Sequence, residues 1–223
     1  MNKHQSIYDS IIKSGHQDRN TAFVFEVYHG RKSKVNAGIL FNKISILEKR
    51  ALDYLKRQDR ILDIGAGAGR ISIYLQRKGY NITALDKSRA ICKVLKKRDI
   101  RKIINADIFK YTPKRKYDVV LFIKVYAGFD EKKENIDRLL KFLIERVLVK
   151  NGRLIFFLSE TKSRGTEFMK RQLIFKGKIS PWLKSLHPSS EDIIKSAENN
   201  DLSIKKLERN NSDQYFLILK KNK

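Results

Sequence analysis

The stretch LDIGAGAGR, residues 62–70, decides the fold of this chain. Gly65, Gly67 and Gly69 alternate with alanine, directly after a short apolar run that includes Asp63. A glycine-rich turn between a buried strand and a helix lets the backbone approach a nucleotide-like ligand closely. The stretch therefore predicts the first strand and the first turn of an α/β domain, with a ligand at the turn.

Strand and helix signals alternate beyond this turn. Short apolar runs predict buried strands, and amphipathic runs between them predict helices. The expected strands are residues 60–64, 81–85, 101–105, 117–125 and 153–160, and the expected helices are residues 68–78, 88–98 and 132–149. This alternation predicts a parallel sheet with helices on both of its faces.

The last part of the chain follows a different pattern. A capped helix is expected at residues 189–199, and strands are expected at 202–207 and 214–219. Only ERNNSD, residues 208–213, separates the two strands, and a connection that short joins antiparallel neighbours. The sheet is therefore predicted to be mostly parallel, with one antiparallel strand near its edge.

The register of the glycines decides between classes of ligand. The dinucleotide fingerprint G-x-G-x-x-G, counted from Gly65, requires a third glycine at position 70, where the chain has Arg70. The phosphate-binding pattern G-x-x-x-x-G-K-[ST] does not occur in the sequence either. The pattern present is acidic-x-G-x-G-x-G, from Asp63 to Gly69.

This pattern resembles motif I of the class I S-adenosylmethionine-dependent methyltransferases. The resemblance continues in ALDKS, which ends the second strand at Asp86, and in NADIF, which supplies Asp107 after the third strand. It implies a Rossmann-like, seven-stranded sheet with strand order 3-2-1-4-5-7-6, and S-adenosylmethionine as cofactor with S-adenosylhomocysteine as product. It also implies that Asp86 binds the ribose hydroxyls and that Asp107 binds the adenine amine. The expected cofactor-binding residues are Asp63, Gly65, Ala66, Gly67, Asp86, Lys87, Asp107, Ile108 and Ile123.

The family resemblance also predicts how the chain is divided into domains. Apolar residues at helical spacing between 36 and 56 predict an amphipathic helix that leads into the core. We expect residues 1–57 to form a helical N-terminal addition on the substrate side. Residues 58–223 are expected to form the cofactor-binding domain, with a lid-like insertion at 161–187.

The methyl acceptor is less constrained than the cofactor. Family members that methylate exocyclic base nitrogens carry an Asn/Asp-Pro-Pro-aromatic motif after the fourth strand, and this chain reads IKVYAG at residues 123–128. The insertion at 161–187 interleaves basic and aromatic residues, which suits an anionic small molecule or peptide. No catalytic residue is assigned, and His29 and Tyr126 are the candidates. The candidate substrate-binding residues are Tyr28, Arg31, Tyr126, Lys170, Arg171, Trp182 and His187.

The charge of the chain leaves two interpretations open. Its 49 Lys and Arg residues against 24 Asp and Glu residues give a net charge of +25. A polyanion partner would explain this excess, so RNA is the alternative acceptor, and a non-catalytic nucleic-acid-binding module is a further alternative. The nucleotide composition of an AT-rich genome would also explain it. A second basic group, around the second helix, is interpreted as a solvated face; it comprises Lys87, Arg89, Lys93, Lys96, Lys97, Arg98, Arg101 and Lys102.

The cysteine content and the lack of long apolar runs argue against a disulfide-bonded, metal-binding or membrane-spanning protein. Cys92 is the only cysteine and the chain has four histidines, so neither an intrachain disulfide nor a metal site is expected. No apolar run reaches the ~20 residues of a membrane span, and no signal-peptide pattern is present near Met1. We therefore expect a cytoplasmic protein without a membrane partner.

Overall fold

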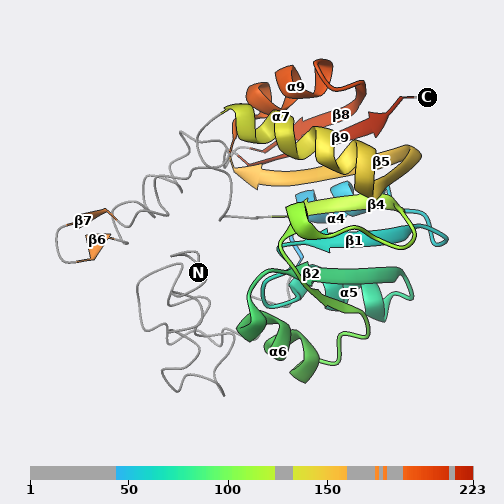
Figure 1. Cartoon of the computed structure of the whole chain (residues 1–223), viewed down its shortest axis with the longest axis vertical. Coiled ribbons are helices and arrows are strands. Elements are labelled where there is room, and N and C mark those ends of the chain that lie inside the picture. Colours follow the sequence, from blue (N-terminus) through green and yellow to red (C-terminus); the bar gives the residue numbers. More distant parts are fainter. Residues whose placement is uncertain are drawn as a thin grey trace.

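A seven-stranded sheet forms the centre of the computed structural model, which describes residues 44–123, 133–159, 174–175, 178–179, 188–210 and 214–222 (Figure 1). The strand order is β3-β2-β1-β4-β5-β9-β8. The strands are β1 (Arg60–Ile64), β2 (Asn81–Asp86), β3 (Ile103–Asn105), β4 (Tyr117–Ile123), β5 (Leu148–Ser159), β8 (Leu202–Arg209) and β9 (Gln214–Lys221). Strands β1 to β5 pair in parallel, and β9 is antiparallel to both β5 and β8. The predicted order and the single antiparallel strand near the edge are confirmed.

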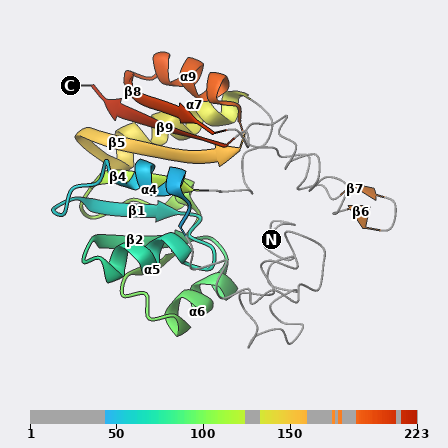
Figure 2. The same ribbon diagram turned by 180° about the vertical axis from the view of Figure 1, so that it is seen from behind.

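Helices cover both faces of this sheet (Figures 1 and 2). One face carries α4 (Ile46–Leu52), α5 (Arg70–Arg77) and α6 (Arg89–Lys97), and the other carries α7 (Lys133–Phe142) and α9 (Ser190–Glu198). The short strands β6 (Ile174–Phe175) and β7 (Lys178–Ile179) pair only with each other. Among the described helices, none is long and apolar enough to cross a membrane.

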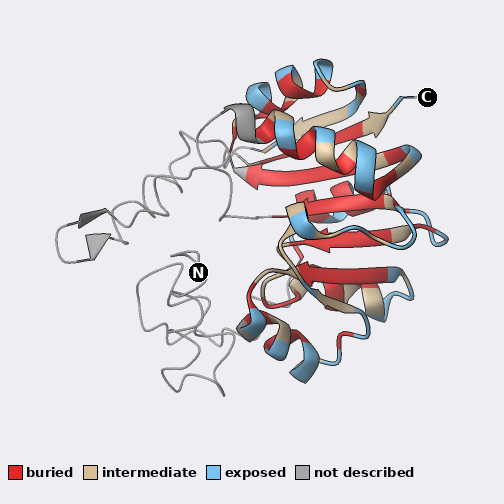
Figure 3. Cartoon of the chain, viewed as in Figure 1, coloured by how far each residue is buried: buried red, intermediate tan, exposed pale blue. Residues whose placement is uncertain are grey.

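The core consists of two layers, because successive residues of a strand point to opposite faces. In β4, Val120 and Phe122 pack on the α7 and α9 side, whereas Val119, Leu121 and Ile123 pack on the α4 and α5 side. The central strands are therefore buried on both faces, as Figure 3 shows. This burial explains why β4 reads as a nearly continuous apolar run.

The helix predicted over 36–56 is present in the described residues as α4, but it is shorter than predicted. Ser45 has extended backbone angles, and it forms a capping box with Glu48, so α4 begins at Ile46. Its side chain accepts a hydrogen bond from the Glu48 amide, and the Glu48 carboxylate accepts one from the Ser45 amide. Such a box fixes a helix start, even where the apolar spacing continues on both sides. Residues 36–43 lie outside the described residues.

The helix predicted over 132–149 ends earlier than expected. Helix α7 passes at Leu143 into a π-helical turn, η3 (Leu143–Val147), and β5 starts at Leu148, which pairs with Tyr117. Leu148 is fully buried, so its strand pairing is stabilised by packing that helical spacing does not reveal. The side chains of Lys116 and Lys221 donate to the Glu145 and Ile144 carbonyls, each at 2.8 Å. Cations are favourable at this end of a helix.

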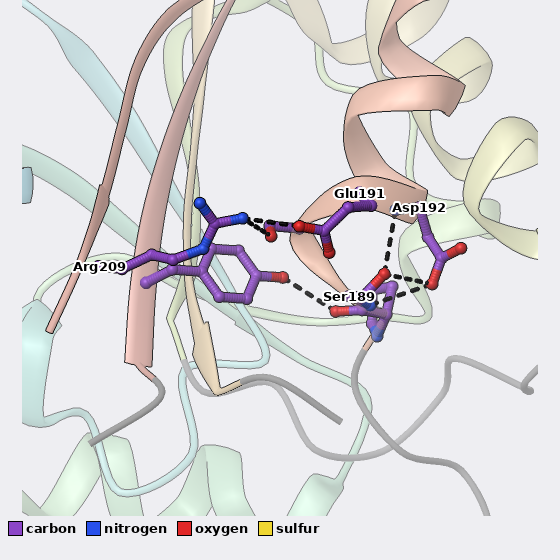
Figure 4. A network of polar contacts seen from close by, with 7 residues as sticks. Ser189, Glu191, Asp192 and Arg209 are labelled. Carbon is purple, nitrogen blue, oxygen red and sulfur yellow. Dashed lines mark hydrogen bonds and ion pairs between the residues drawn. The ribbon is translucent and has the colours of Figure 1, made fainter. Parts of the chain in front are cut away.

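Helix α9 starts where the sequence predicts a capped helix. Ser189 and Asp192 form its capping box, and the Arg209 guanidinium donates to the Ser190 hydroxyl and to the Glu191 carboxylate, both at 2.7 Å (Figure 4). The buried Tyr215 hydroxyl donates to the Pro188 carbonyl at 2.9 Å. These contacts attach the start of α9 to the β8–β9 hairpin.

Candidate cofactor site

The glycine-rich turn lies at the carboxyl ends of β1 and β2. The amides of Gly65 and Ala66 both donate to the Leu85 carbonyl, at 2.8 and 3.1 Å. The Gly69 amide then donates to the Ala66 carbonyl at 2.9 Å, which closes the turn directly before α5. Ligands of open α/β sheets bind outside the carboxyl ends of the strands, so the turn stands where a ligand is expected.

The turn and the acidic residue of β2 meet in the structure. The Asp86 carboxylate accepts hydrogen bonds from the Gly67 amide at 3.1 Å and from the Ser88 amide at 2.9 Å. Asp86 is half-buried, and burial raises its pKa above the usual value of 3.8, while these two amides and Lys87 oppose the rise. Two residues that are far apart in the sequence, Gly67 and Asp86, therefore form one site.

The glycines of the turn are required for two different reasons. Gly67 has φ +52°, and the nearest neighbour of a Cβ added there is the Gly65 carbonyl oxygen, at 3.9 Å. Gly69 has φ +78°, and an added Cβ would lie 2.6 Å from the Leu95 side chain of α6. Internal packing thus requires a glycine at 69, whereas no side chain of the described residues lies within 4 Å of a Cβ added at Gly67.

Asp63 faces into the protein. Its side chain is buried, and the Ser72 hydroxyl of α5 donates to it at 2.6 Å. Burial raises the pKa of Asp63 to about 6, against the lowering effects of Ser72 and of nearby Arg70. The contact thus ties β1 to α5 beneath the turn, and a direct or water-mediated contact of Asp63 with the cofactor stays a prediction.

The raised pKa of Asp63 predicts a pH dependence of stability. Because the folded state binds this proton more tightly than the unfolded state, Asp63 stabilises the fold below pH 4, and this stability is lost as the pH rises through about 6. Asp63→Asn keeps the neutral form, so its unfolding free energy relative to the parent should rise by about 3 kcal/mol between pH 4 and 8. Urea unfolding at several pH values measures this difference. A difference that does not change with pH would contradict the prediction, and Ser72→Ala should move the transition to higher pH.

The end of β3 contributes a second group of predicted residues. Asp107 caps the short helix η2 (Ile108–Lys110), and its carboxylate accepts from the Phe109 amide at 3.0 Å. Ile108 packs against the core on the α7 side. The side-chain amide of Asn105 donates at 3.0 Å to the backbone carbonyls of both Asp86 and Lys87. The ends of β2 and β3 are therefore joined, which places Asp107 on the same edge of the sheet as Asp86.

An ion pair beneath the turn is absent from the sequence-based predictions. Glu48 of α4 is 1% exposed and pairs with both terminal nitrogens of Arg70, the first residue of α5. The pair joins residues that are 22 positions apart, so no local spacing signals it. The sequence does give a weak indication that Ser72 has a buried hydrogen-bond partner, because it is a polar residue between two isoleucines on the buried side of α5.

The remaining predicted residues divide into two groups. Ile123 ends β4 and is buried against the α4 and α5 side of the core. The acceptor-side candidates lie outside the described residues; they are Tyr28, His29, Arg31, Tyr126, Lys170, Arg171, Trp182 and His187.

Comparison with known proteins supports the assignment of the turn. The sequence matches the family model of a methyltransferase domain over residues 38–174, and no curated protein matches it. Magnesium protoporphyrin IX methyltransferase from Synechocystis PCC 6803, solved with bound SAH, has a TM-score of 0.67 at 18% identity, covering 98% of this chain and 100% of that chain. A SAM-dependent methyltransferase from Bacteroides fragilis, in complex with S-adenosyl-L-homocysteine, has a TM-score of 0.65 at 18% identity, covering 86% of this chain and 84% of that chain.

The two structures share the fold of this chain, and the family model shares its sequence pattern. The match of the model includes the glycine-rich turn, Asp86 and Asp107, the residues that carry the predicted resemblance. Since the model spans more than half of the chain, the protein belongs to the methyltransferase domain family and has the Rossmann-like fold of the class I enzymes.

Proposed function

We propose that this protein transfers a methyl group from S-adenosylmethionine to a small-molecule or peptide acceptor that carries an anionic group. The observation that carries the cofactor assignment is the open side of Gly67 beside the Asp86 carboxylate. A backbone without a side chain can lie against the amino-acid and ribose parts of a nucleoside. The half-buried Asp86 carboxylate beside it can accept hydrogen bonds from two hydroxyl groups.

Each predicted residue has a distinct task in this proposal. Asp86 accepts hydrogen bonds from the ribose hydroxyls, and the turn from Gly65 to Gly67 lies against the rest of the cofactor. Asp107 and Ile108 contact the adenine, the first by hydrogen bonding and the second by apolar packing. The cofactor supplies a methyl group that its sulfonium already activates. The chain's own residues then mainly position the acceptor and remove its proton where necessary, with His29 and Tyr126 as the candidates.

Gly67→Ala tests the cofactor site and Gly69→Ala is its matched control. A methyl group at 67 should lower the affinity for S-adenosylhomocysteine at least about tenfold, and the positive φ should cost only about 1–2 kcal/mol of stability. At 69 the same change meets Leu95, so it should cost more stability, by about a further 1–3 kcal/mol of overpacking. Calorimetry and urea unfolding measure the two effects. Parental affinity in folded Gly67→Ala would place the ligand elsewhere.

The acceptor class rests on the predicted insertion at 161–187, with Lys170, Arg171 and Trp182 as candidate contacts. RNA is the second candidate, and the net charge of +25 favours it. Labelled S-adenosylmethionine incubated with protein and a cell extract distinguishes them, because label enters either the low-mass and peptide fraction or the RNA fraction. Label in RNA alone would overturn the small-molecule proposal. Absence of label from every fraction, with nucleic-acid binding intact, would favour the non-catalytic module.

A further inference from the structure

Basic residues are most numerous at the amino ends of the parallel strands, although Lys87, Arg89 and Lys110 lie near the carboxyl ends. The carboxyl ends of β1, β2 and β3 carry Asp63, Asp86 and Asp107. The segments that lead into the amino ends of β1 to β4 read KRQDR (56–60), RKG (77–79), KKRDIRK (96–102) and PKRK (113–116). We call these four segments together the basic edge.

The four segments of the basic edge lie side by side. Strands β3, β2, β1 and β4 are consecutive in the sheet and parallel. Strands β2, β1 and β4 start at the same end of the sheet (Figure 1), whereas β3 starts level with Ala84, inside the length of β2. Direct contacts join the segments as well. The Arg60 guanidinium donates to the Arg115 carbonyl, and the Lys102 ammonium donates to Asn81 at 2.6 Å. The basic edge is therefore one continuous surface.

The four segments contain thirteen basic residues and two acidic ones, Asp59 and the exposed Asp99. The side chain of Asp59 is buried and pairs with Arg153 of β5 at 2.6 Å, so it does not neutralise its own segment. Burial, and then the nearby Arg77, lower the pKa of the Arg98 guanidinium. Positive charges on this surface are thus close enough to repel one another, and a partner that supplies negative charge would relieve this repulsion.

Helix dipoles and genome composition each account for only part of the pattern. Cations complement the dipole at the carboxyl end of a helix, which explains Arg77 at the end of α5 and Lys97 at the end of α6. The dipole does not explain Arg57, Lys114 or Arg115, which precede strands and follow no helix end directly. A genome-wide bias toward lysine predicts single basic residues at both ends of the strands, such as Lys87 and Lys110. It does not by itself predict the runs KKR (96–98) and KRK (114–116), which both lie in the basic edge.

Aromatic rings accompany the cations on this surface. The Arg57 guanidinium lies 4.8 Å from the ring centroid of Tyr80, and the Lys78 ammonium lies 5.1 Å from that of Tyr74. Both rings are half-buried and belong to the same continuous surface. Basic residues beside aromatic rings are typical of surfaces that follow a nucleic-acid backbone.

We propose that the basic edge binds the phosphodiester backbone of a nucleic acid. Neutralising phosphates releases counterions, which is the main driving force for such binding. The segments before β1, β2 and β4 lie at the opposite ends of their strands from the glycine-rich turn, whereas the segment 96–102 contacts the turn, since Arg98 donates to the Ala68 carbonyl at 2.6 Å. A nucleic acid bound along the segments before β1, β2 and β4 leaves the cofactor site free. The proposal is therefore independent of the methyl acceptor, and it gives a role to the basic residues of 96–102, which the sequence alone presents as part of a solvated face.

Charge reversal at matched positions tests this surface. The edge variant combines Lys97→Glu, Arg101→Glu and Lys114→Glu, all exposed residues of the basic edge. The control variant combines Lys141→Glu, Lys195→Glu and Lys205→Glu, which are exposed on α7, α9 and β8 and change the net charge equally. Fluorescence anisotropy with labelled single-stranded RNA, and separately with duplex DNA, measures binding across a salt series.

The parent should bind with micromolar affinity, and the edge variant at least about tenfold more weakly. The slope of log affinity against log salt should fall by about 2–3 in the edge variant and stay near parental in the control. Preference between the two probes identifies RNA or DNA as the source of the backbone. Equal losses in both variants, or binding only to anionic lipid vesicles, would overturn the proposal. Calorimetry with S-adenosylhomocysteine keeps this outcome separate from the cofactor assignment, since both variants should retain that affinity.

Discussion

Asp86→Ala is expected to lower the affinity for S-adenosylhomocysteine by about 30- to 1,000-fold, or about 2–4 kcal/mol. The proposed reason is the loss of two charge-assisted hydrogen bonds to the ribose hydroxyls. The structure adds a second reason, because the same carboxylate accepts from the Gly67 and Ser88 amides. Without it, the turn loses a support as well as a ligand contact. Calorimetry on the purified variant measures the change.

Two further variants separate these contributions. Asp86→Asn retains an oxygen that can accept from one of the two amides, so the turn should be less disturbed while the charge is lost. Its affinity should therefore lie between those of the parent and the alanine variant. Asp53→Asn removes a carboxylate from an exposed position at the end of α4 and serves as the control. Parental affinity in a folded Asp86→Ala protein would refute the assignment of the cofactor site.

Glu48→Ala is expected to lower the free energy of unfolding by about 3–5 kcal/mol. Glu48 is almost completely buried, and its partner Arg70 has a side chain only 17% exposed. Removal of the carboxylate takes away a direct counter-charge of the largely buried guanidinium, and the Ser45 amide also loses its capping acceptor. Urea or thermal unfolding measures the loss.

The paired substitution gives the sharper test of this ion pair. In Glu48→Leu with Arg70→Met neither charge of the pair is left over, so most of the lost stability should return at a pH below about 6, where the neighbouring Asp63 is protonated. Glu48→Gln keeps an oxygen for the Ser45 amide, and it should therefore lose less than the alanine variant. A double variant as unstable as the sum of its single variants would show that the two side chains act independently.

The strands were predictable because local pattern and burial agree. Strand β1 starts and ends at the predicted residues, Arg60 and Ile64, since a short apolar run buried on both faces has few alternatives. The helix predicted over 36–56 is shorter in its described part, because the capping box at Ser45 starts α4 within a continuous apolar pattern. The predicted end of α7 was too late, because pairing of Leu148 with Tyr117 is a contact between distant segments. A contact between distant segments thus decided the end of α7, whereas a local capping box decided the start of α4.

In the candidate site too, some residues could be predicted from the sequence and others could not. Gly67, Asp86 and Asp107 follow strand ends, so a parallel sheet brings them to one edge once the fold is known. The residues that support them were not predicted, because Ser72 meets Asp63 across two elements and Glu48 meets Arg70 from a separate helix. Spacing in a sequence identifies groups that share an element or a strand end. It does not identify partners whose proximity depends on how the helices pack.

The position of β9 has a consequence for how the protein folds during synthesis. Strand β9 follows all other described strands in the sequence, yet it lies inside the sheet, between β5 and β8. While the ribosome is still making residues 214–222, β5 has an unpaired edge and β8 has no neighbour in the sheet. An unpaired apolar strand edge is a template for pairing with other chains. We therefore expect the nascent chain to expose the edge of β5 until β9 has been made, which a sheet whose last strand is added at the outside would not do.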